Sequence, residues 1–144
     1  MVAIKNIKSQ FDTLEMYNVF SNCLYMPTWD KFIAEAKEYM RNDAINIFGY
    51  YEDNRVIGII VIKQNKNGIF EIKGIAVDSE FRKHGLGKKL IKYVCDKLSI
   101  CTLLAETDDD AVGFYRRCGF ETEKFKRTGD NGEYIRYKCI LRIL

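Results

Sequence analysis

Residues 72–88 constrain the fold of this chain more than any other stretch. A largely apolar run up to Val77 leads through a polar turn into a segment that repeats apolar residues at helical spacing from Leu86 onward. Gly85 and Gly87 lie at the junction, where glycine allows the backbone to approach a ligand closely. A strand that turns into a helix in this way presents unpaired N–H groups at the positive end of the helix dipole, so we expect an anion site here.

Basic residues surround this glycine turn. The chain carries 23 basic and 20 acidic side chains, and this mixed, mildly basic balance argues against a nucleic-acid-binding protein. The densest basic cluster is Arg82-Lys83-His84 with Lys88, which suggests a compact anionic ligand, most naturally a pyrophosphate. The turn has too few glycines for a dinucleotide fingerprint, and Lys89 stands where a P-loop has Ser or Thr.

The remaining patterns predict a single α/β domain over residues 1–144, with helices on the faces of its sheet. Two capped helices, beginning near Asp12 and Thr28, follow a first short strand. Three strands then form an antiparallel meander, and a helix, a strand, a second helix and a closing hairpin complete the order β-α-α-β-β-β-α-β-α-β-β. The strands are expected at residues 2–7, 45–51, 55–63, 69–77 and 102–106 and around the turn at 129–132.

The cysteines and acidic runs give no sign of a metal or of disulfides. Five cysteines are an odd number, they form no CxxC pair, and only one histidine accompanies them, so we expect reduced thiols and a cytoplasmic protein. The Asp108–Asp110 run more simply caps the helix that follows it than binds a divalent ion. No apolar run reaches the ~18 residues that a membrane span needs.

Two motifs resemble the GCN5-related N-acetyltransferases (GNAT family). Arg82 to Gly87 matches the acyl-CoA loop of that family, and the segment from Ala111 to Phe120, with its Phe-Tyr pair, matches a second motif. The resemblance implies a mixed, mostly antiparallel sheet of six to seven strands whose fourth strand is bulged, and Gly74 is a plausible place for that bulge. It also implies acetyl-CoA as the acyl donor.

The same resemblance assigns the cofactor contacts. The backbone before the loop is expected to pair with pantetheine, the glycine loop to hold the pyrophosphate, and Phe114 to pack in the core beside it. His84 is expected to contact the loop or cofactor rather than to act as a base. The predicted contacts are Ile75, Ala76, Val77, Arg82, Lys83, His84, Gly85, Leu86, Gly87, Lys88 and Phe114.

The chemistry requires an acid, a polarised carbonyl and a neutral amine. The resemblance makes Tyr115 the general acid near the CoA sulfur and places the carbonyl-polarising backbone N–H near Val77. Glu71 is the first candidate for the base and Glu106 the second, and the sequence leaves this choice open.

The expected activity is direct transfer of an acetyl group to a primary amine in a ternary complex, without a metal. The acceptor is open among polyamines, aminoglycosides, amino acids, peptide N-termini and protein lysines. Tyr25, Met26 and Trp29 are candidates to line its site. The alternative is a non-catalytic acyl-CoA-binding module, and a homodimer stays open in either case.

Overall fold

Left-handed turn residues join the strands of the central meander in the computed structural model, which describes residues 2–82 and 84–143. Asp53 and Asn54 have φ values of 49° and 66° between β2 (Ile45–Glu52) and β3 (Arg55–Gln64). Positive φ at both central residues is what a two-residue hairpin turn requires. The turn before β4 (Ile69–Val77) likewise contains two left-handed residues in succession.

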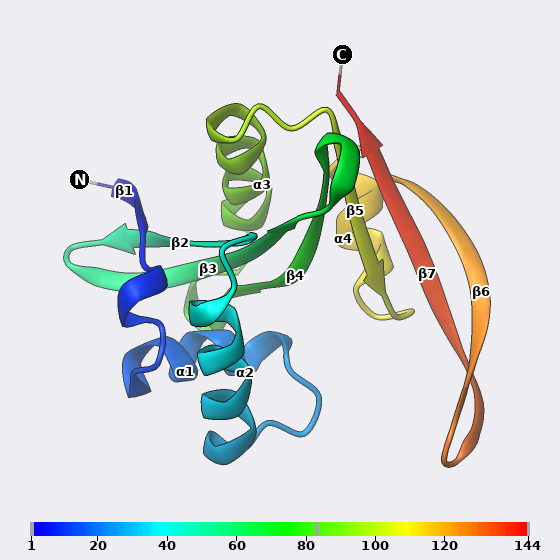
Figure 1. The fold of residues 1–144 in the computed structure, drawn as a ribbon, viewed down its shortest axis with the longest axis horizontal. Helices are drawn as coiled ribbons and strands as arrows, with labels where there is room; N and C mark the ends of the chain where they lie inside the picture. The colour runs from blue at the N-terminus through cyan, green and yellow to red at the C-terminus, as the bar shows by residue number, and fades with distance from the viewer. Residues whose placement is uncertain (1, 83, 144) are drawn as a thin grey trace.

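The strands form one seven-stranded sheet in the order β1-β2-β3-β4-β5-β7-β6 (Figure 1). Only β4 and β5 are parallel, so the prediction of a mixed, mostly antiparallel sheet is confirmed. β7 inserts between β5 and β6, which leaves the β6–β7 hairpin at one edge. The remaining strands are β1 (Val2–Asn6), β5 (Thr102–Thr107), β6 (Glu121–Gly129) and β7 (Gly132–Arg142).

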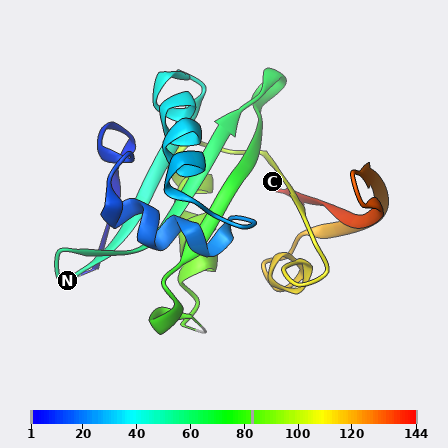
Figure 2. The same ribbon diagram turned by 90° about the horizontal axis from the view of Figure 1, so that it is seen from below.

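Helices cover both faces of the sheet (Figures 1 and 2). We call the two sides the α1/α2 face and the α3/α4 face. Thr28 caps its helix as predicted, but the cap of the preceding helix is Thr13, one residue later than the predicted Asp12. The helices are α1 (Leu14–Phe20), α2 (Trp29–Arg41), α3 (Leu86–Lys97) and α4 (Val112–Arg117), with short 3-10 turns η1 (Lys8–Gln10), η2 (Ser21–Cys23), η3 (Lys66–Gly68) and η4 (Ser79–Phe81).

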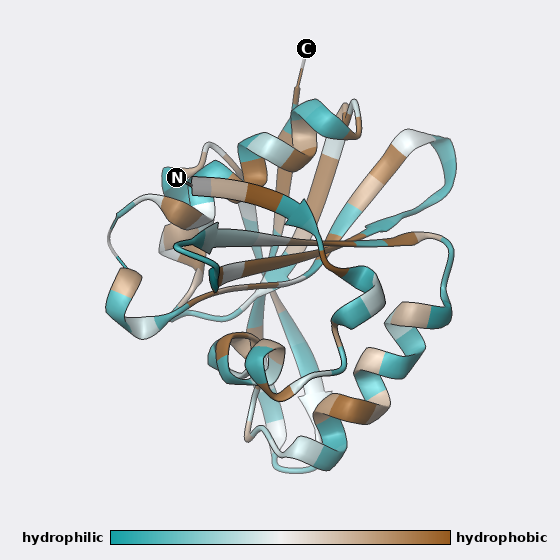
Figure 3. Ribbon diagram, turned by 90° about the vertical axis from the view of Figure 1, so that its left-hand side faces the viewer, coloured by the Kyte–Doolittle hydropathy of each residue, from teal (hydrophilic) through white to brown (hydrophobic). Residues whose placement is uncertain are grey.

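Each face of the sheet buries its own apolar cluster, and apolar residues are concentrated along the central strands (Figure 3). On the α1/α2 face, Phe20 and Phe32 pack over Ile59. On the α3/α4 face, Leu90 and Tyr115 pack in the other cluster. Because side chains alternate between faces along a strand, these clusters also show which way each neighbouring polar residue points. No helix among the described residues is long and apolar enough to cross a membrane.

A bulge interrupts β4 at the predicted place. Val61 pairs with Gly74, but the next residue of β3, Ile62, pairs with Ile72, so Lys73 is an extra residue in β4. A Cβ atom at Gly74 would lie 2.5 Å from Cζ of Phe20, so close packing against α1 requires glycine there. The predicted bulge of the fourth strand is therefore confirmed, and it ends at a close contact with α1.

Candidate active site

The parallel strands β4 and β5 separate shortly after they meet. They pair only where Ile69–Glu71 faces Thr102–Leu104, although β4 continues to Val77 and β5 to Thr107 (Figure 1). Beyond this point the facing edge of β4 has no strand partner. Unpaired backbone donors and acceptors can bind an extended chain by strand addition, so this edge suits the predicted pantetheine site.

The predicted contacts on this edge point to both faces of the sheet. Ile75 and Val77 pack on the α3/α4 side, whereas Ala76 is buried on the α1/α2 side. The bulge that frees backbone groups lies at Lys73 and Gly74, three to four residues before Val77, where the polarising N–H was expected. The candidate donor for the carbonyl is therefore shifted toward the start of the unpaired edge.

The glycine turn forms an open helix N-terminus. Gly85 has a φ of 74° and is the residue before α3, and among the described residues other than its two chain neighbours no atom lies within 4 Å of the place where its Cβ would be. The first helical hydrogen bond joins Lys89 N–H to Gly85 C=O, so the N–H groups of Leu86, Gly87 and Lys88 have no partner within the helix. The first turn of α3 contains no acidic residue. These groups fit an anion such as a pyrophosphate.

Gly87 has a different role from the one expected. A Cβ there would lie 2.8 Å from Cε1 and Cζ of Phe114, whereas the position beside Gly85 is open. Gly87 therefore brings α3 close to the predicted Phe-Tyr motif of α4, and only Gly85 leaves space for a ligand. Leu86 is buried, so its contribution to the loop is its backbone N–H.

The charged residues of the loop differ in their contacts. Arg82 donates a hydrogen bond from Nη2 to Oδ1 of Asn22 at 3.0 Å, which ties the loop to the α1–α2 connection. His84 and Lys88 are exposed beside the start of α3. Lys83, also predicted to contact the cofactor, lies outside the described residues. Lys88, in the first turn of α3, stays a candidate to add positive charge to the anion site.

Tyr115 lies on the α3/α4 face and is only 6% exposed. Its ring packs edge-on against Phe114 and Phe120, each at 5.2 Å between centroids. No hydrogen bond involves its hydroxyl among the described residues, and no fully buried side-chain oxygen there lacks a partner, so the hydroxyl reaches accessible space. Burial, followed by the nearby thiols of Cys139 and Cys23, raises the pKa of Tyr115 above its ordinary value. The phenol therefore stays protonated, as a general acid must.

The two candidate bases lie on the opposite, α1/α2 face. Both line a cavity of about 360 Å³ with Ile72, Lys73 and two arginines. Glu71 is 33% exposed, and its carboxylate is 3.9 Å from the Lys73 ammonium. This contact is long, so Glu71 is available to a substrate. Glu71 and Tyr115 thus lie on the two sides of the opening between β4 and β5.

Glu106 is held by two arginines of the β6–β7 hairpin. Arg127 donates to both carboxylate oxygens, at 2.9 and 2.5 Å, and Arg136 donates to one at 3.0 Å. Hydrogen bonds from Arg127 and then Arg136 outweigh partial burial and lower the pKa of Glu106 from 4.5 to about 2. A carboxylate with so low a pKa is a poor proton acceptor near neutral pH. Its evident role is to fix the hairpin against β5.

This network predicts an acid-sensitive contribution to stability. Because the folded pKa of Glu106 is lowered, the contribution is fully present above about pH 4.5 and is lost as the pH falls toward 2. We expect Glu106→Gln to cost about 1 kcal/mol at pH 7, since about a third of the side chain is exposed and solvent screens the pairs. Urea unfolding at pH 7, 4 and 2.5 should show the difference from wild type shrinking with acidity. Glu123→Gln, an exposed carboxylate on β6, should cost little at any pH; an equal cost in both variants would contradict the assignment.

Titratable residues of α2 and η2 also lie on the α1/α2 face. The Tyr39 hydroxyl donates a hydrogen bond to the Glu35 carboxylate. Burial, this bond and the charges of Glu35, Cys23 and Glu71 raise the pKa of Tyr39. Cys23 as a residue is exposed, but its thiol is desolvated. This burial, and then the charge of Glu35, raises the pKa of the Cys23 thiol to about 12, so the thiol is not a nucleophile near neutral pH.

The three apolar residues predicted to line the acceptor site are exposed to solvent. Tyr25 is 89% exposed and Met26 67%, and Trp29 is also exposed while its ring packs against Tyr17 and Phe32. They lie at the α1–α2 connection, as the turn at Pro27 suggested. These side chains border the α1/α2 face, and none of them is part of the core.

The sequence did not indicate four residues of this site. Glu35 and Tyr39 are four apart on α2, a spacing that could have suggested a shared helix face. Arg127 and Arg136 contact Glu106 although they are 21 and 30 residues away from it in the sequence, and no local sequence pattern predicts such pairs.

The Asp108–Asp110 run makes internal contacts. The residue before α4 is Ala111, so none of the three aspartates is the predicted cap. Asp108 Oδ1 instead accepts the Ala111 N–H at 3.0 Å, which stabilises the turn entering α4, and Asp109 accepts the Tyr137 hydroxyl at 2.6 Å. Within residues 2–82 and 84–143 there is no group of three His, Cys, Asp or Glu side chains placed to hold a metal ion.

The chain is similar to proteins of known family. Residues 15–141 match the model of the acetyltransferase (GNAT) domain. Streptothricin acetyltransferase A of Bacillus subtilis (strain 168) is 34% identical over 88 residues, which cover 57% of this chain and 51% of that protein. The chain thus matches about half the length of this relative.

Solved structures show the same fold. The ribosomal-protein-S18-alanine N-acetyltransferase of Escherichia coli superposes with a TM-score of 0.77 at 18% identity, covering 99% of this chain and 94% of that one. A GNAT family acetyltransferase from Elizabethkingia anophelis with acetyl-CoA bound gives 0.72 at 18% identity, covering 99% and 98%.

Proposed function

Because this chain belongs to the GNAT acetyltransferase family, we propose that it transfers an acetyl group from acetyl-CoA to a primary amine. The observation that carries the proposal is the opening between β4 and β5, with Tyr115 on one side and Glu71 on the other. An acid and a base on either side of one gap suit a direct transfer between two substrates that meet in it.

The donor enters the proposed reaction from the α3/α4 side. Acetyl-CoA supplies an acetyl group activated as a thioester. The N–H groups at the start of α3 bind its pyrophosphate, and the free edge of β4 binds its pantetheine chain. Backbone N–H groups freed by the bulge at Lys73 and Gly74 stabilise negative charge on the carbonyl oxygen.

The acceptor approaches from the α1/α2 side. Glu71, directly or through a water molecule, takes a proton from the ammonium so that the nitrogen lone pair can attack the carbonyl carbon. The new C–N bond forms as the C–S bond breaks, and Tyr115 gives its proton to the departing sulfur. The second proton lost by the nitrogen restores the Tyr115 hydroxyl through water, and Glu71 releases its proton to solvent. Glu71 is favoured over Glu106 as the base, because the two arginines that lower the pKa of Glu106 make its carboxylate a weak proton acceptor.

A panel of amines tests the proposal. Purified protein with acetyl-CoA should release CoA thiol only when an acceptor is present, and mass spectrometry should find the acetylated amine. The panel contains a polyamine, an aminoglycoside, an amino acid, a peptide with a free N-terminus, a lysine peptide and streptothricin, the last because of the Bacillus subtilis relative. We expect turnover to persist with EDTA, since no step uses a metal.

The control is Glu71→Gln, which keeps the shape of the side chain and removes its basicity. It should lower turnover by about 10²-fold at neutral pH and leave acetyl-CoA binding unchanged. If the protein binds acetyl-CoA tightly but no amine of the panel promotes thiol release, the chain is a cofactor-binding module instead.

A further inference from the structure

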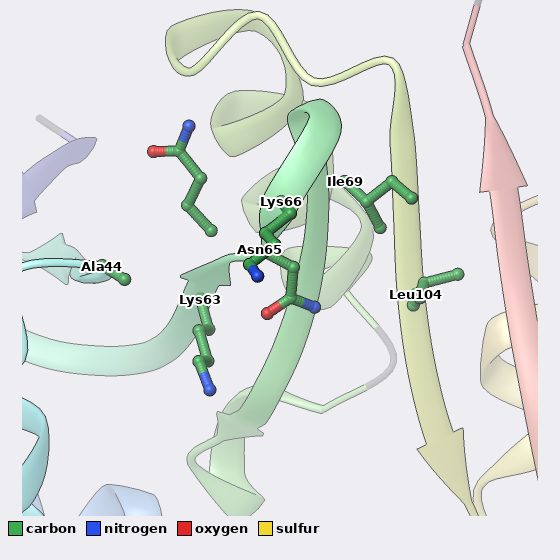
Figure 4. A pocket seen from close by; sticks show the side chains of 7 residues that line it. Ala44, Lys63, Asn65, Lys66, Ile69 and Leu104 are labelled. Carbon is green, nitrogen blue, oxygen red and sulfur yellow. The ribbon is translucent and has the colours of Figure 1, made fainter.

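A second and larger cavity lies on the α1/α2 face, outside the residues assigned to the reaction. It is a shallow depression, widely open to solvent, with a volume of about 740 Å³. Ile69 of β4 and Leu104 of β5 form its apolar floor, with Ala44 at one side (Figure 4). Lys63, Gln64, Asn65 and Lys66 complete its lining.

This cavity continues the one that contains Glu71. Ile69 and Glu71 are two residues apart on β4, and Leu104 and Glu106 are two apart on β5, so each pair points to the same face. Glu71 and Leu104, one from each cavity, face each other in the β4–β5 ladder. The two cavities therefore lie next to each other along the same two strands, and we call the pair the groove.

The part of the groove lined by the β3–β4 turn is positively charged, with Lys66 in the turn beyond Ile69 and Lys63 facing Glu71 across the β3–β4 ladder. Among the described residues, neither the Lys63 nor the Lys66 ammonium has a carboxylate within 4 Å, although Lys63 is partly buried. The amide of Asn65, also partly buried, lies between them in the sequence and makes no side-chain hydrogen bond there. Two unpaired ammonium groups and an amide above an apolar floor suit a ligand with an apolar chain and an anionic end.

The rim that carries these side chains is fixed by its backbone. The Asn65 N–H donates to the Ile69 C=O at 2.7 Å, and the Gln64 N–H donates to the Ala44 C=O at 2.8 Å. Asn67 and Gly68, both left-handed at φ 65° and 72°, close the turn between them. A rim held in this way loses little conformational entropy when it binds a ligand.

We infer that this end of the groove binds the distal part of the acceptor, and that this part carries an anionic group such as a carboxylate, held between Lys63 and Lys66. The inference rests on the proposed function, because Glu71 sets where the amine lies. From Glu71 to Ile69, the first residue of β4 after the turn that carries Lys66, the strand spans about 7 Å, and the Lys63 side chain reaches toward the same end from its position beside Glu71. The amine and the anion should therefore be separated by about five methylene groups, each adding roughly 1.3 Å to an extended chain.

Two acetylated probes test the subsite directly. 6-Acetamidohexanoate has the proposed anion, and N-hexylacetamide has a chain of similar length without it. NMR titration in the presence of CoA should show 6-acetamidohexanoate shifting the methyl signals of Ile69 and Leu104, with an affinity at least tenfold above that of N-hexylacetamide. Lys63→Met/Lys66→Met should remove this preference, and Lys92→Met/Lys97→Met, two exposed lysines of α3, should keep it.

Equal affinity for the two probes, no shift of either methyl signal, or an undiminished preference in Lys63→Met/Lys66→Met would each overturn the inference. The proposed function is judged separately. A protein that acetylates uncharged amines but shows no probe preference keeps its function and loses this subsite. A protein that acetylates nothing loses the proposed function, whatever the probes do.

Discussion

Replacing Tyr115 by phenylalanine should lower turnover by about 10²-fold and leave acetyl-CoA affinity nearly unchanged. Positioned acids contribute ~10²- to 10⁴-fold to a rate. We expect the lower end, equivalent to about 2.7 kcal/mol of barrier, because a thiol with a pKa of ~8.5 can leave unprotonated at some rate. Proton donation to the sulfur acts in the transition state, so kcat should fall while the Kd of acetyl-CoA stays the same.

The ring of Tyr115 remains in this variant, and with it the packing against Phe114 and Phe120, so thermal stability should barely change. Tyr50→Phe is the matched control, since it removes a hydroxyl from the same apolar cluster at a distant strand. Turnover of Tyr115→Phe at the wild-type rate across the pH range would mean that the phenol only packs. A loss of acetyl-CoA affinity in proportion to the loss of rate would place Tyr115 in the cofactor pocket.

Gly85→Val should abolish the stabilisation that acetyl-CoA gives. At a ligand concentration 100 times Kd, binding stabilises a protein by about 2.7 kcal/mol, which raises Tm by roughly 5–10 °C in a domain of this size. A β-branched residue disfavours the left-handed conformation of Gly85, and its side chain would enter the open space before α3. The N–H groups of Leu86 to Lys88 would then no longer converge on one anion.

The quantity to compare is the shift in Tm on adding acetyl-CoA, because the strain lowers the Tm of the unliganded variant too. Gly132→Val introduces the same kind of strain, since Gly132 has a φ of 100° and an equally open Cβ position in the β6–β7 turn. This control should keep the full shift. If Gly85→Val keeps it as well, the pyrophosphate does not bind at the start of α3.

Most of the fold could be predicted because its signals are local. The turn at Asp53-Asn54 and the helix cap at Thr28 each specify a boundary within a few residues. Thr13 rather than Asp12 caps α1. Both residue types cap helices well, so the sequence alone does not distinguish them. The insertion of β7 between β5 and β6 depends on pairings between distant segments, which no short pattern encodes.

The candidate site likewise contains residues that local motifs predict and residues that only long-range contacts reveal. Gly85 and the position of Tyr115 follow from motifs contained in a few residues. The pairing of Arg82 with Asn22 and the two arginines around Glu106 join residues 21 to 60 positions apart. The packing role of Gly87 became visible only with Phe114 against it. Charge partners and close packing therefore had to come from the structure, and the arginines around Glu106 are the reason for proposing Glu71 as the base.

The opening between β4 and β5 separates the surfaces assigned to the two substrates, so the two surfaces can change independently during evolution. The surfaces assigned to the donor belong to β4, α3 and α4, whereas those assigned to the acceptor belong to α2, the β3–β4 turn and the β6–β7 hairpin. They share little beyond β4 and the bulge at Lys73. After gene duplication, one copy could accumulate substitutions on the acceptor side and take up a new amine, while both copies inherit an intact donor site.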